Sequence, residues 1–463
     1  MRRLTLLLLV AALAAPAGAQ AARPLTTGFY DSAFSEDTVW LQRATDVGAG
    51  MLRVHFKWAD VAPATRPAGF DPRNPADPAY DWETTDRLVR QTTEGGMAVL
   101  LSFSLAPRWA EGPRRPRSAG AGTWLPDPAA VGDFGAALAR RYSGTFADPA
   151  DAARTLPRVR AFQLWNEQNL DIYLAPQWRK VRGRYRAVAP HHYRQMLKAF
   201  RTGVRANAPG SLVASGGTAP YGDPDPGGAR MQPVRFVREL FCVNATLRRR
   251  TCSGKVGLDV LAHHPYSVGR PRRRALNRDD ASIPDLGKLS RVVRAARRLG
   301  RVSGSSPRLW VTEVSYDSSP PDPDGIPVAR HARYAEETLY LLWKARVSVV
   351  IWLTIRDSPP NPSYDSTLQA GPFYLDGRRK PAATAFRFPF VTERTSRSRV
   401  RAWGRAPVAG RVVIERRSGS GWKRVTSFRA GRRATFLRSL GLRSRATLRA
   451  RVAGETSLAW TQR

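Results

Sequence analysis

Eight repeats of a short apolar run followed by a longer amphipathic stretch fill residues 25 to 388. The runs predict strands and are LTTGFY (25–30), MLRVHF (51–56), AVLLSFS (98–104), VRAFQLWNE (159–167), SLVASGG (211–217), LDVLAHHPY (258–266), RLWVTEVS (308–315) and VSVVIWLT (347–354). Helical stretches between them, such as 35–49, 81–96 and 191–210, begin at capping residues or end in glycine. This alternation is typical of parallel β/α units, and eight units close a (β/α)8 TIM barrel. The alternative is a doubly wound sheet, but the sequence has no GxGxxG after the first predicted strand.

The chain changes character after Pro389. Residues 390–463 lose the helical period and show short alternating runs separated by Gly and Ser, which predict a small antiparallel β-sandwich behind a barrel of residues 23–389. From position 391 onward the segment holds 19 arginine and lysine residues and 3 glutamates. Two interpretations stay open: an accessory domain that binds an anionic wall polymer or glycan, and a cap that only packs on the barrel.

The first 22 residues predict a secretory signal peptide. Met1-Arg2-Arg3 is a short basic region, an apolar run follows from Leu4 to Ala15, and small residues at 17–19 form a cleavage site. The apolar run of about 12 residues falls short of the ~20 that span a bilayer, which argues against an uncleaved anchor. We therefore expect a secreted, extracellular protein with no membrane span after signal cleavage.

The chain has two cysteines, Cys242 and Cys252. In an exported protein an oxidising compartment favours pairing, and two cysteines without a nearby histidine make a poor metal site. We expect a structural disulfide between them rather than free thiols or a metal.

The formal charge of +38 restricts the partners of the protein without naming one. A basic balance suits nucleic acid, anionic membranes or acidic polymers. No zinc-finger, helix-turn-helix or RNA-binding signature is present and an exported chain seldom meets nucleic acid, so we expect no nucleic-acid partner. A genome-wide bias toward arginine, on a protein surface with no special partner, explains the charge equally well.

Two glutamates end predicted strands on opposite sides of the barrel. Glu167 closes the fourth strand in FQLWNE, and Glu313 closes the seventh in WVTE. The carboxyl ends of barrel strands converge on the face where TIM-barrel enzymes place their chemistry. Paired carboxylates are what glycosidic bond cleavage requires, one as proton donor and one as nucleophile.

Four short motifs in barrel order give these glutamates a family context. They are Arg53-Val54-His55 on the second strand, WNEQNL (165–170) on the fourth, His264-Pro265-Tyr266 on the sixth and Thr312-Glu313 on the seventh. The set resembles clan A of the glycoside hydrolases and is most similar to family 39, the β-xylosidase and iduronidase family; family 5 shares most of the motifs. The match extends over about 330 residues in islands. Gln168 stands where the family usually has proline, a change that removes no reacting group.

The resemblance implies a role for each matched residue. Glu167 would be the general acid and base, and Glu313 the nucleophile of a retaining, double-displacement reaction. Asn166 would hold the sugar 2-hydroxyl, Arg53 would keep Glu313 ionised, and Tyr266 would donate to the same carboxylate.

Further substrate contacts are expected from His55 and His264, and from Trp352 as an aromatic platform under the reacting sugar. The rim aromatics Trp109, Trp165, Tyr173 and Trp178 are weaker candidates of the same kind. No cofactor is implied. A zinc site built from His55, His263 and His264 is conceivable, but adjacent residues on a strand face opposite sides, so we expect no metal.

Two functions from different classes follow. The first is a retaining glycoside hydrolase acting on a poly- or oligosaccharide. The second is a non-catalytic glycan-binding or cell-wall-associated protein on a barrel scaffold. Basic loops at 107–117, 177–186 and 269–274 make an anionic, uronic-acid-containing substrate a further hypothesis. No GxSxG elbow supports a serine hydrolase. The sugar, the linkage, exo or endo action and the oligomeric state are not determined by these patterns.

Overall fold

The structure, a computed structural model, describes residues 22–249, 252 and 255–462. The signal peptide predicted from residues 1–22 lies, except for Ala22, outside the described residues. In the described part of the chain, no helix combines the length and apolar character needed to cross a membrane.

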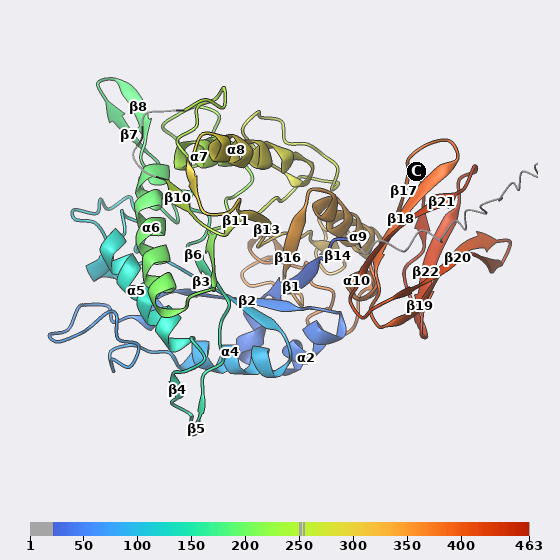
Figure 1. The fold of residues 1–463 in the computed structure, drawn as a ribbon, viewed down its shortest axis with the longest axis horizontal. Helices are drawn as coiled ribbons and strands as arrows, with labels where there is room; N and C mark the ends of the chain where they lie inside the picture. The colour runs from blue at the N-terminus through green and yellow to red at the C-terminus, as the bar shows by residue number, and fades with distance from the viewer. Residues whose placement is uncertain (1–21, 250–251, 253–254, 463) are drawn as a thin grey trace, which may run out of the picture.

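Eight parallel strands close into a barrel, as the sequence predicts (Figure 1). Around the barrel, each strand pairs with the strands of the neighbouring β/α units, which excludes the open doubly wound sheet. The barrel strands are β1 (Thr26–Tyr30), β2 (Met51–Lys57), β3 (Ala98–Ser104), β6 (Ala161–Leu164), β9 (Leu212–Ser215), β11 (Val260–His263), β13 (Arg308–Val311) and β16 (Val347–Leu353). The observed fourth to seventh strands end two to four residues before the predicted ends, because the chain turns into rim loops there.

Helices surround this barrel and follow the strands in sequence. They are α1 (Ala33–Glu36), α2 (Val39–Asp46), α3 (Trp58–Val61), α4 (Glu83–Glu94), α5 (Pro128–Arg141), α6 (Ala189–Asn207), α7 (Pro233–Leu240), α8 (Gly287–Arg298), α9 (Val328–Lys344) and α10 (Pro381–Arg387). Short 3-10 turns lie at Arg108–Ala110, Ile283–Asp285 and Tyr364–Ser366. Small strand pairs decorate the loops: β4 (Ala147–Asp148) with β5 (Asp151–Thr155), β7 (Trp178–Val181) with β8 (Arg184–Ala187), β10 (Val256–Gly257) with β12 (Val302–Ser303), and β14 (Ser318–Ser319) with β15 (Ile326–Pro327).

Side chains inside the barrel form layers along its axis. One apolar cluster inside the barrel consists of Met51, Leu100, Ala161, Ala214, Val260, Trp310, Val349 and Ile351. Because strand side chains alternate between the two faces, the residue two positions further along each strand lies in the next layer toward the carboxyl ends. Four of these residues are polar, namely Arg53, Ser102, Gln163 and Thr312, so the floor of the barrel mouth carries charge and hydrogen-bonding groups.

A β-sandwich follows the barrel and begins with β17 at Phe390, to one side of α9 and α10 (Figure 1). One antiparallel sheet contains β17 (Phe390–Arg394), β18 (Arg399–Arg405) and β21 (Thr435–Gly441). The other contains β20 (Gly421–Ala430), β19 (Gly410–Ser418), β22 (Thr447–Val452), β23 (Glu455–Thr456) and β24 (Trp460–Thr461). The ion pair Arg387–Glu455 and the hydrogen bonds from Arg405 to the carbonyl of Gly48 join sandwich and barrel. The predicted antiparallel sandwich is therefore confirmed.

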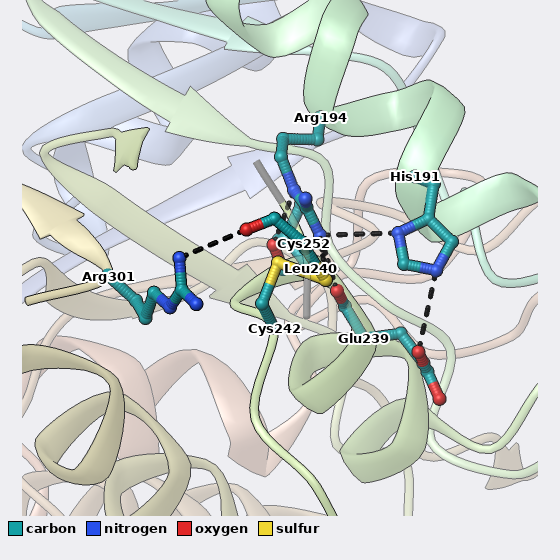
Figure 2. The surroundings of a disulfide bond; sticks show 7 residues. All are labelled: His191, Arg194, Glu239, Leu240, Cys242, Cys252 and Arg301. Carbon is teal, nitrogen blue, oxygen red and sulfur yellow. Dashed lines mark hydrogen bonds and ion pairs between the residues drawn. A yellow bond between two sulfur atoms is a disulfide. The ribbon is translucent and has the colours of Figure 1, made fainter. Parts of the chain in front are cut away.

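The predicted disulfide between Cys242 and Cys252 is present, with Cα atoms 5.8 Å apart (Figure 2). It ties the segment after α7 to the segment before β10. Two arginines flank the bond: Arg301 donates to the carbonyl of Cys252 at 3.2 Å, and Arg194 donates to the carbonyl of Leu240 at 2.8 Å. Buried or half-buried guanidinium groups thus hold one backbone carbonyl near each end of the disulfide.

Candidate active site

The two glutamates predicted to react meet at the carboxyl ends of the barrel strands. One oxygen of Glu167, one oxygen of Glu313 and one ring nitrogen of His264 all lie within 4.8 Å of one another. The side chains of Glu167 and Glu313 are 15% and 11% exposed, whereas that of His264 is fully buried. A ligand entering the barrel mouth can therefore reach both carboxylates, whereas the imidazole of His264 is buried.

Glu313 is held by a cation and a hydroxyl. A guanidinium nitrogen of Arg53 forms an ion pair with its Oε1, and the hydroxyl of Tyr266 donates to its Oε2 at 3.2 Å. Burial acts to raise the pKa of Glu313, but the charges of His264 and Arg53 and the hydrogen bonds from Arg53 and Tyr266 outweigh it. The pKa of Glu313 therefore lies below its usual value, and the group is an anion at neutral pH.

Arg53 also fixes Asn166 through the other arm of its planar fork. Its second terminal nitrogen donates to Oδ1 of Asn166 at 2.9 Å, and its Nε donates to the hydroxyl of Ser102 at 3.2 Å. Its guanidinium carbon also lies 4.9 Å from the centre of the Tyr30 ring. With Oδ1 bound to Arg53, Asn166 has its amide nitrogen as the side-chain hydrogen-bond donor.

Glu167 is positioned by His264 and by an uncommon backbone. Nδ1 of His264 lies 3.0 Å from Oε1 of Glu167, and its Nε2 lies 3.0 Å from the hydroxyl of Thr312. Trp165 and Glu167 have φ angles of +72° and +34°, in the left-handed region that side-chain-bearing residues rarely adopt. The chain leaves strand alternation at this point, and backbone hydrogen bonds hold the turn, including Glu167 N to the carbonyl of Gly217 at 3.0 Å. Strain of this kind clusters at functional sites.

Two hydroxyls hold His55 in the site. Its Nδ1 and Nε2 lie 2.9 and 3.1 Å from the hydroxyls of Ser102 and Ser104, and its ring packs edge-on against Tyr30. Burial, the charge of Arg53 and the proximity of His264 lower the pKa of His55 well below its usual value. His55 is thus a neutral residue that supports Arg53 through their shared partner Ser102.

Two tyrosines at the site remain protonated at neutral pH. Burial, followed by the negative charges of Glu313 and Glu167, raises the pKa of Tyr266 well above its usual value, so its hydroxyl stays a donor. Burial and the same two carboxylates raise the pKa of Tyr173 to about 12. Tyr173 was only a weak rim candidate from sequence, and the structure brings it close to Glu167 and Glu313.

The structure contradicts the expected role of Trp352 as a sugar platform. Its side chain is fully buried, its indole nitrogen donates to the carbonyl of Ala370 at 2.7 Å, and its ring packs edge-on against Phe386 of α10. Since Ile351 lies inside the barrel, the next residue on the strand points outward to the helices. Leu353, one residue later, takes the inward position at the mouth opposite Tyr30.

The other rim tryptophans differ in position. Trp165 is fully buried, with its indole nitrogen bonded to the carbonyl of Tyr173. Trp109 is partly buried and packs against Trp58. Trp178 lines a cavity of about 350 Å³ between the loops that follow β3, β6 and β9. Trp178 is therefore the rim tryptophan that the structure places at a cavity.

The three histidines considered for zinc do not converge. His263 faces away from the barrel interior, with Thr218 and the carbonyl of Ala281 each 2.8 Å from its ring nitrogens. Within the part of the chain that the structure describes, the candidate group for a cation is Glu167, His264 and Glu313. A metal ion there would meet the permanent charge of Arg53, which argues against a metal at these residues.

Polar residues that complete the site escaped the sequence interpretation. Ser102, Ser104 and Gln163 lie on strands whose runs read as almost wholly apolar, yet Ser102 bonds to both Arg53 and His55. Gln163 donates to the hydroxyl of Thr312 at 3.2 Å, which in turn contacts His264. The signal that would have identified them is their strand alternation with inward apolar residues: Ser102 and Ser104 follow Leu100 by two and four positions, and Gln163 follows Ala161 by two.

Comparison with known proteins supports the fold. No protein-family model and no curated protein sequence matches the chain. By structure, the chain is similar to a family 39 glycoside hydrolase from the gut symbiont Bacteroides cellulosilyticus WH2, with a TM-score of 0.55 and 17% identity over 90% of this chain and 81% of that one. Weaker likenesses include the exo-β-1,4-mannosidase Op5Man5 from Opitutaceae bacterium strain TAV5 (TM-score 0.45, 18% identity, 79% of this chain and 59% of that one). Another is a family 30 endoxylanase from Clostridium papyrosolvens C71 (TM-score 0.47, 12% identity, 94% and 97%). The resemblance to family 39 inferred from sequence is thus confirmed for the fold.

Proposed function

We propose that this chain is a secreted retaining glycoside hydrolase that cleaves O-glycosidic bonds of poly- or oligosaccharides. The observation that carries the proposal is the approach of Glu167 and Glu313 to within 4.8 Å, oxygen to oxygen, at the barrel mouth. Carboxyl groups ~5–5.5 Å apart are typical of retaining enzymes, whereas inverting enzymes need ~6.5–9.5 Å to admit a water molecule. The shared fold with a family 39 glycoside hydrolase agrees with this assignment.

In the first step Glu313 attacks the anomeric carbon of the sugar. Its Oε1 is paired with Arg53 and its Oε2 accepts a hydrogen bond from Tyr266, and these two contacts orient the carboxylate for attack. A carbon–oxygen bond forms to Glu313 while the bond to the leaving oxygen breaks and its electron pair stays with that oxygen. Glu167 supplies the proton that the leaving oxygen needs, and His264 orients it through Oε1. The product is a glycosyl ester of Glu313 and a free alcohol.

In the second step the same two glutamates release the sugar. Glu167, now a carboxylate, removes a proton from water, and the water oxygen attacks the anomeric carbon. The ester bond breaks and Glu313 regains its negative charge, which Arg53 and Tyr266 stabilise as they do in the resting site. Two inversions return the anomeric carbon to its original configuration.

Two hypotheses describe the charge of the substrate. A neutral glycan needs only the groups described above. A uronic-acid-containing glycan would also use arginines of the rim loops 107–117, 177–186 and 269–274, because guanidinium groups bind carboxylates bidentately. Turnover of matched neutral and uronic-acid substrates across salt concentrations separates them, since only the anionic substrate should lose turnover as salt rises.

The test of the reaction is an assay of the mature protein beside Glu313→Ala and Glu167→Ala, on aryl β-glycosides and on plant and bacterial polysaccharides. Both variants should lose activity, and Glu83→Ala, an exposed glutamate on α4, should not. Added azide should restore turnover to Glu313→Ala as a glycosyl azide of inverted configuration. In Glu167→Ala the azide product should keep the configuration of the substrate.

Other results would reject the proposal. Polysaccharide binding that survives both substitutions, without turnover by the unaltered protein, would favour the non-catalytic glycan-binding alternative. Activity that persists in Glu313→Ala without azide would exclude Glu313 as nucleophile. Secretion is tested separately by the amino-terminal sequence of the exported protein, which should begin near residue 23 if the signal peptide is removed.

A further inference from the structure

One face of the larger sandwich sheet concentrates arginine. On β19 and β22 the inward side chains Val412, Ile414, Leu448 and Ala450 are fully buried. The alternate positions face outward, and cross-strand pairing places them side by side: Arg411 opposite Arg429, and Glu415 opposite both Arg424 and Arg449. We call this surface the outer arginine face; its basic members are Arg411, Arg417, Arg424, Arg429, Arg449 and Arg451.

The charge of this face is almost uncompensated. Glu415 is its one acidic residue, and it pairs with Arg449 at 2.7 Å and Arg451 at 3.6 Å. Among the residues that the structure describes, no carboxylate forms an ion pair with the other four arginines. Like charges directly opposite on neighbouring strands, as at Arg411 and Arg429, destabilise a sheet. An anionic partner would remove this repulsion.

Part of the face is held in a fixed orientation. The guanidinium carbon of Arg449 lies 4.1 Å from the centre of the Trp422 ring, and that of Arg417 lies 6.0 Å from it. Trp422 and Arg417 are directly opposite each other at the end of the β19–β20 hairpin. A planar guanidinium stacked on an aromatic ring loses less freedom when it binds a carboxylate through its fork.

The arrangement suits a polymer better than a small anion. A single exposed ion pair contributes little to binding, so one carboxylate would bind weakly. A chain with repeated carboxylates can engage several arginines at once, and each further contact is then intramolecular. The face also has a fixed relation to the active site, because Arg387–Glu455 and the buried Arg405 attach the sandwich to the barrel.

We propose that the outer arginine face binds an acidic polysaccharide, a polymer whose sugar units carry carboxylates, and holds it beside the barrel. The choice of a polysaccharide among polyanions rests on the proposed function; the binding of a polyanion by this face does not. Binding is electrostatic and spread over several arginines, so its affinity falls as the salt concentration rises.

The experiment compares two triple variants of the mature full-length chain that lose the same charge. The first is Arg411→Gln, Arg424→Gln and Arg429→Gln on the face. The control is Arg140→Gln, Arg291→Gln and Arg298→Gln, exposed residues of α5 and α8. Binding to polygalacturonate, to neutral dextran and to single-stranded DNA is measured by titration at several salt concentrations, in a Glu167→Ala background that prevents hydrolysis.

We expect the face variant to bind polygalacturonate about tenfold more weakly and with a shallower salt dependence, and the control to stay within about twofold. Equal loss in both variants would overturn the proposal, because net charge alone would then explain binding. Absence of binding by the unaltered chain, or tighter binding of DNA than of polygalacturonate, would also overturn it. Hydrolysis of small aryl glycosides, tested separately with Glu167 intact, should be equal in both variants and reports only on the active site.

Discussion

Arg53 and Glu313 lie 260 residues apart in the sequence and form a buried ion pair in the mouth of the barrel. The side chain of Arg53 is fully buried and that of Glu313 is 11% exposed, so this carboxylate keeps one edge accessible to a ligand while its charge is balanced from within. The same guanidinium also orients Asn166. Arg53 therefore connects the residues of strands β2, β6 and β13 into one site.

Replacing Arg53 by methionine should destabilise the protein and abolish turnover. The substitution removes the permanent counter-ion of the buried Glu313, a change that costs about 3–5 kcal/mol in the free energy of unfolding. Denaturant unfolding at neutral pH measures it. Arg73→Met, which breaks an exposed pair with Asp133, should change stability by less than about 1 kcal/mol. Equal effects of the two substitutions would contradict the assigned role of Arg53.

Removing the Tyr266 hydroxyl should move the acidic side of the pH profile of kcat/KM to higher pH. The pKa of Glu313 is lowered in the folded protein, partly by this hydroxyl, so Tyr266→Phe raises that pKa and Glu313 loses its charge earlier as pH falls. The pH dependence of kcat/KM measures the shift. Tyr185→Phe, on the exposed β7–β8 hairpin, should leave the acidic side of the profile in place.

The contact between Tyr266 and Glu313 also predicts how the free energy of unfolding depends on pH. Because the folded pKa of Glu313 lies below its unfolded value of about 4.3, its contribution is fully present above that value and is lost as pH falls through the folded pKa. The difference in unfolding free energy between the unaltered chain and Tyr266→Phe should be roughly 1.5–3 kcal/mol at neutral pH and should shrink below about pH 4. A difference that is constant with pH would indicate lost packing instead.

Trp352→Ala should act on stability and not on sugar binding. Deleting this buried ring creates a cavity against α10 and should cost about 3–5 kcal/mol, seen as a lower Tm. KM for short aryl glycosides should stay within about twofold at temperatures where the variant is folded. Phe29→Ala, in the same outward cluster, should behave alike. A large rise in KM with unchanged Tm would restore the platform role expected from sequence.

Loss of the disulfide should lower the stability of the protein and leave its activity unchanged. The bond between Cys242 and Cys252 closes a loop of about 11 residues, which corresponds to about 3 kcal/mol of unfolded-state entropy. The double variant to serine should unfold at lower denaturant concentration, and the unaltered chain should shift in the same direction when reductant is added. Activity below the transition should be retained, since the bond lies outside the catalytic group.

The sequence was most informative where polar residues interrupt an apolar strand. In MLRVHF the alternation Met51, Arg53, His55 identifies one face of the strand, and the structure places all three inside the barrel. In VSVVIWL nearly every residue is apolar, because a parallel barrel strand is buried on both faces. Periodicity there cannot say which face is inside, and the prediction for Trp352 failed for that reason.

By itself, the sequence determined the order of eight β/α units, the sandwich that follows them, and the two glutamates that come just after the fourth and seventh strands. These features depend on local periodicity and on position along a strand. Only the tertiary structure decided which residues complete the site. Ser102 and Gln163 became its floor, and Glu167 turned toward His264 through a left-handed backbone, because barrel closure and strand register bring together side chains that are distant in sequence.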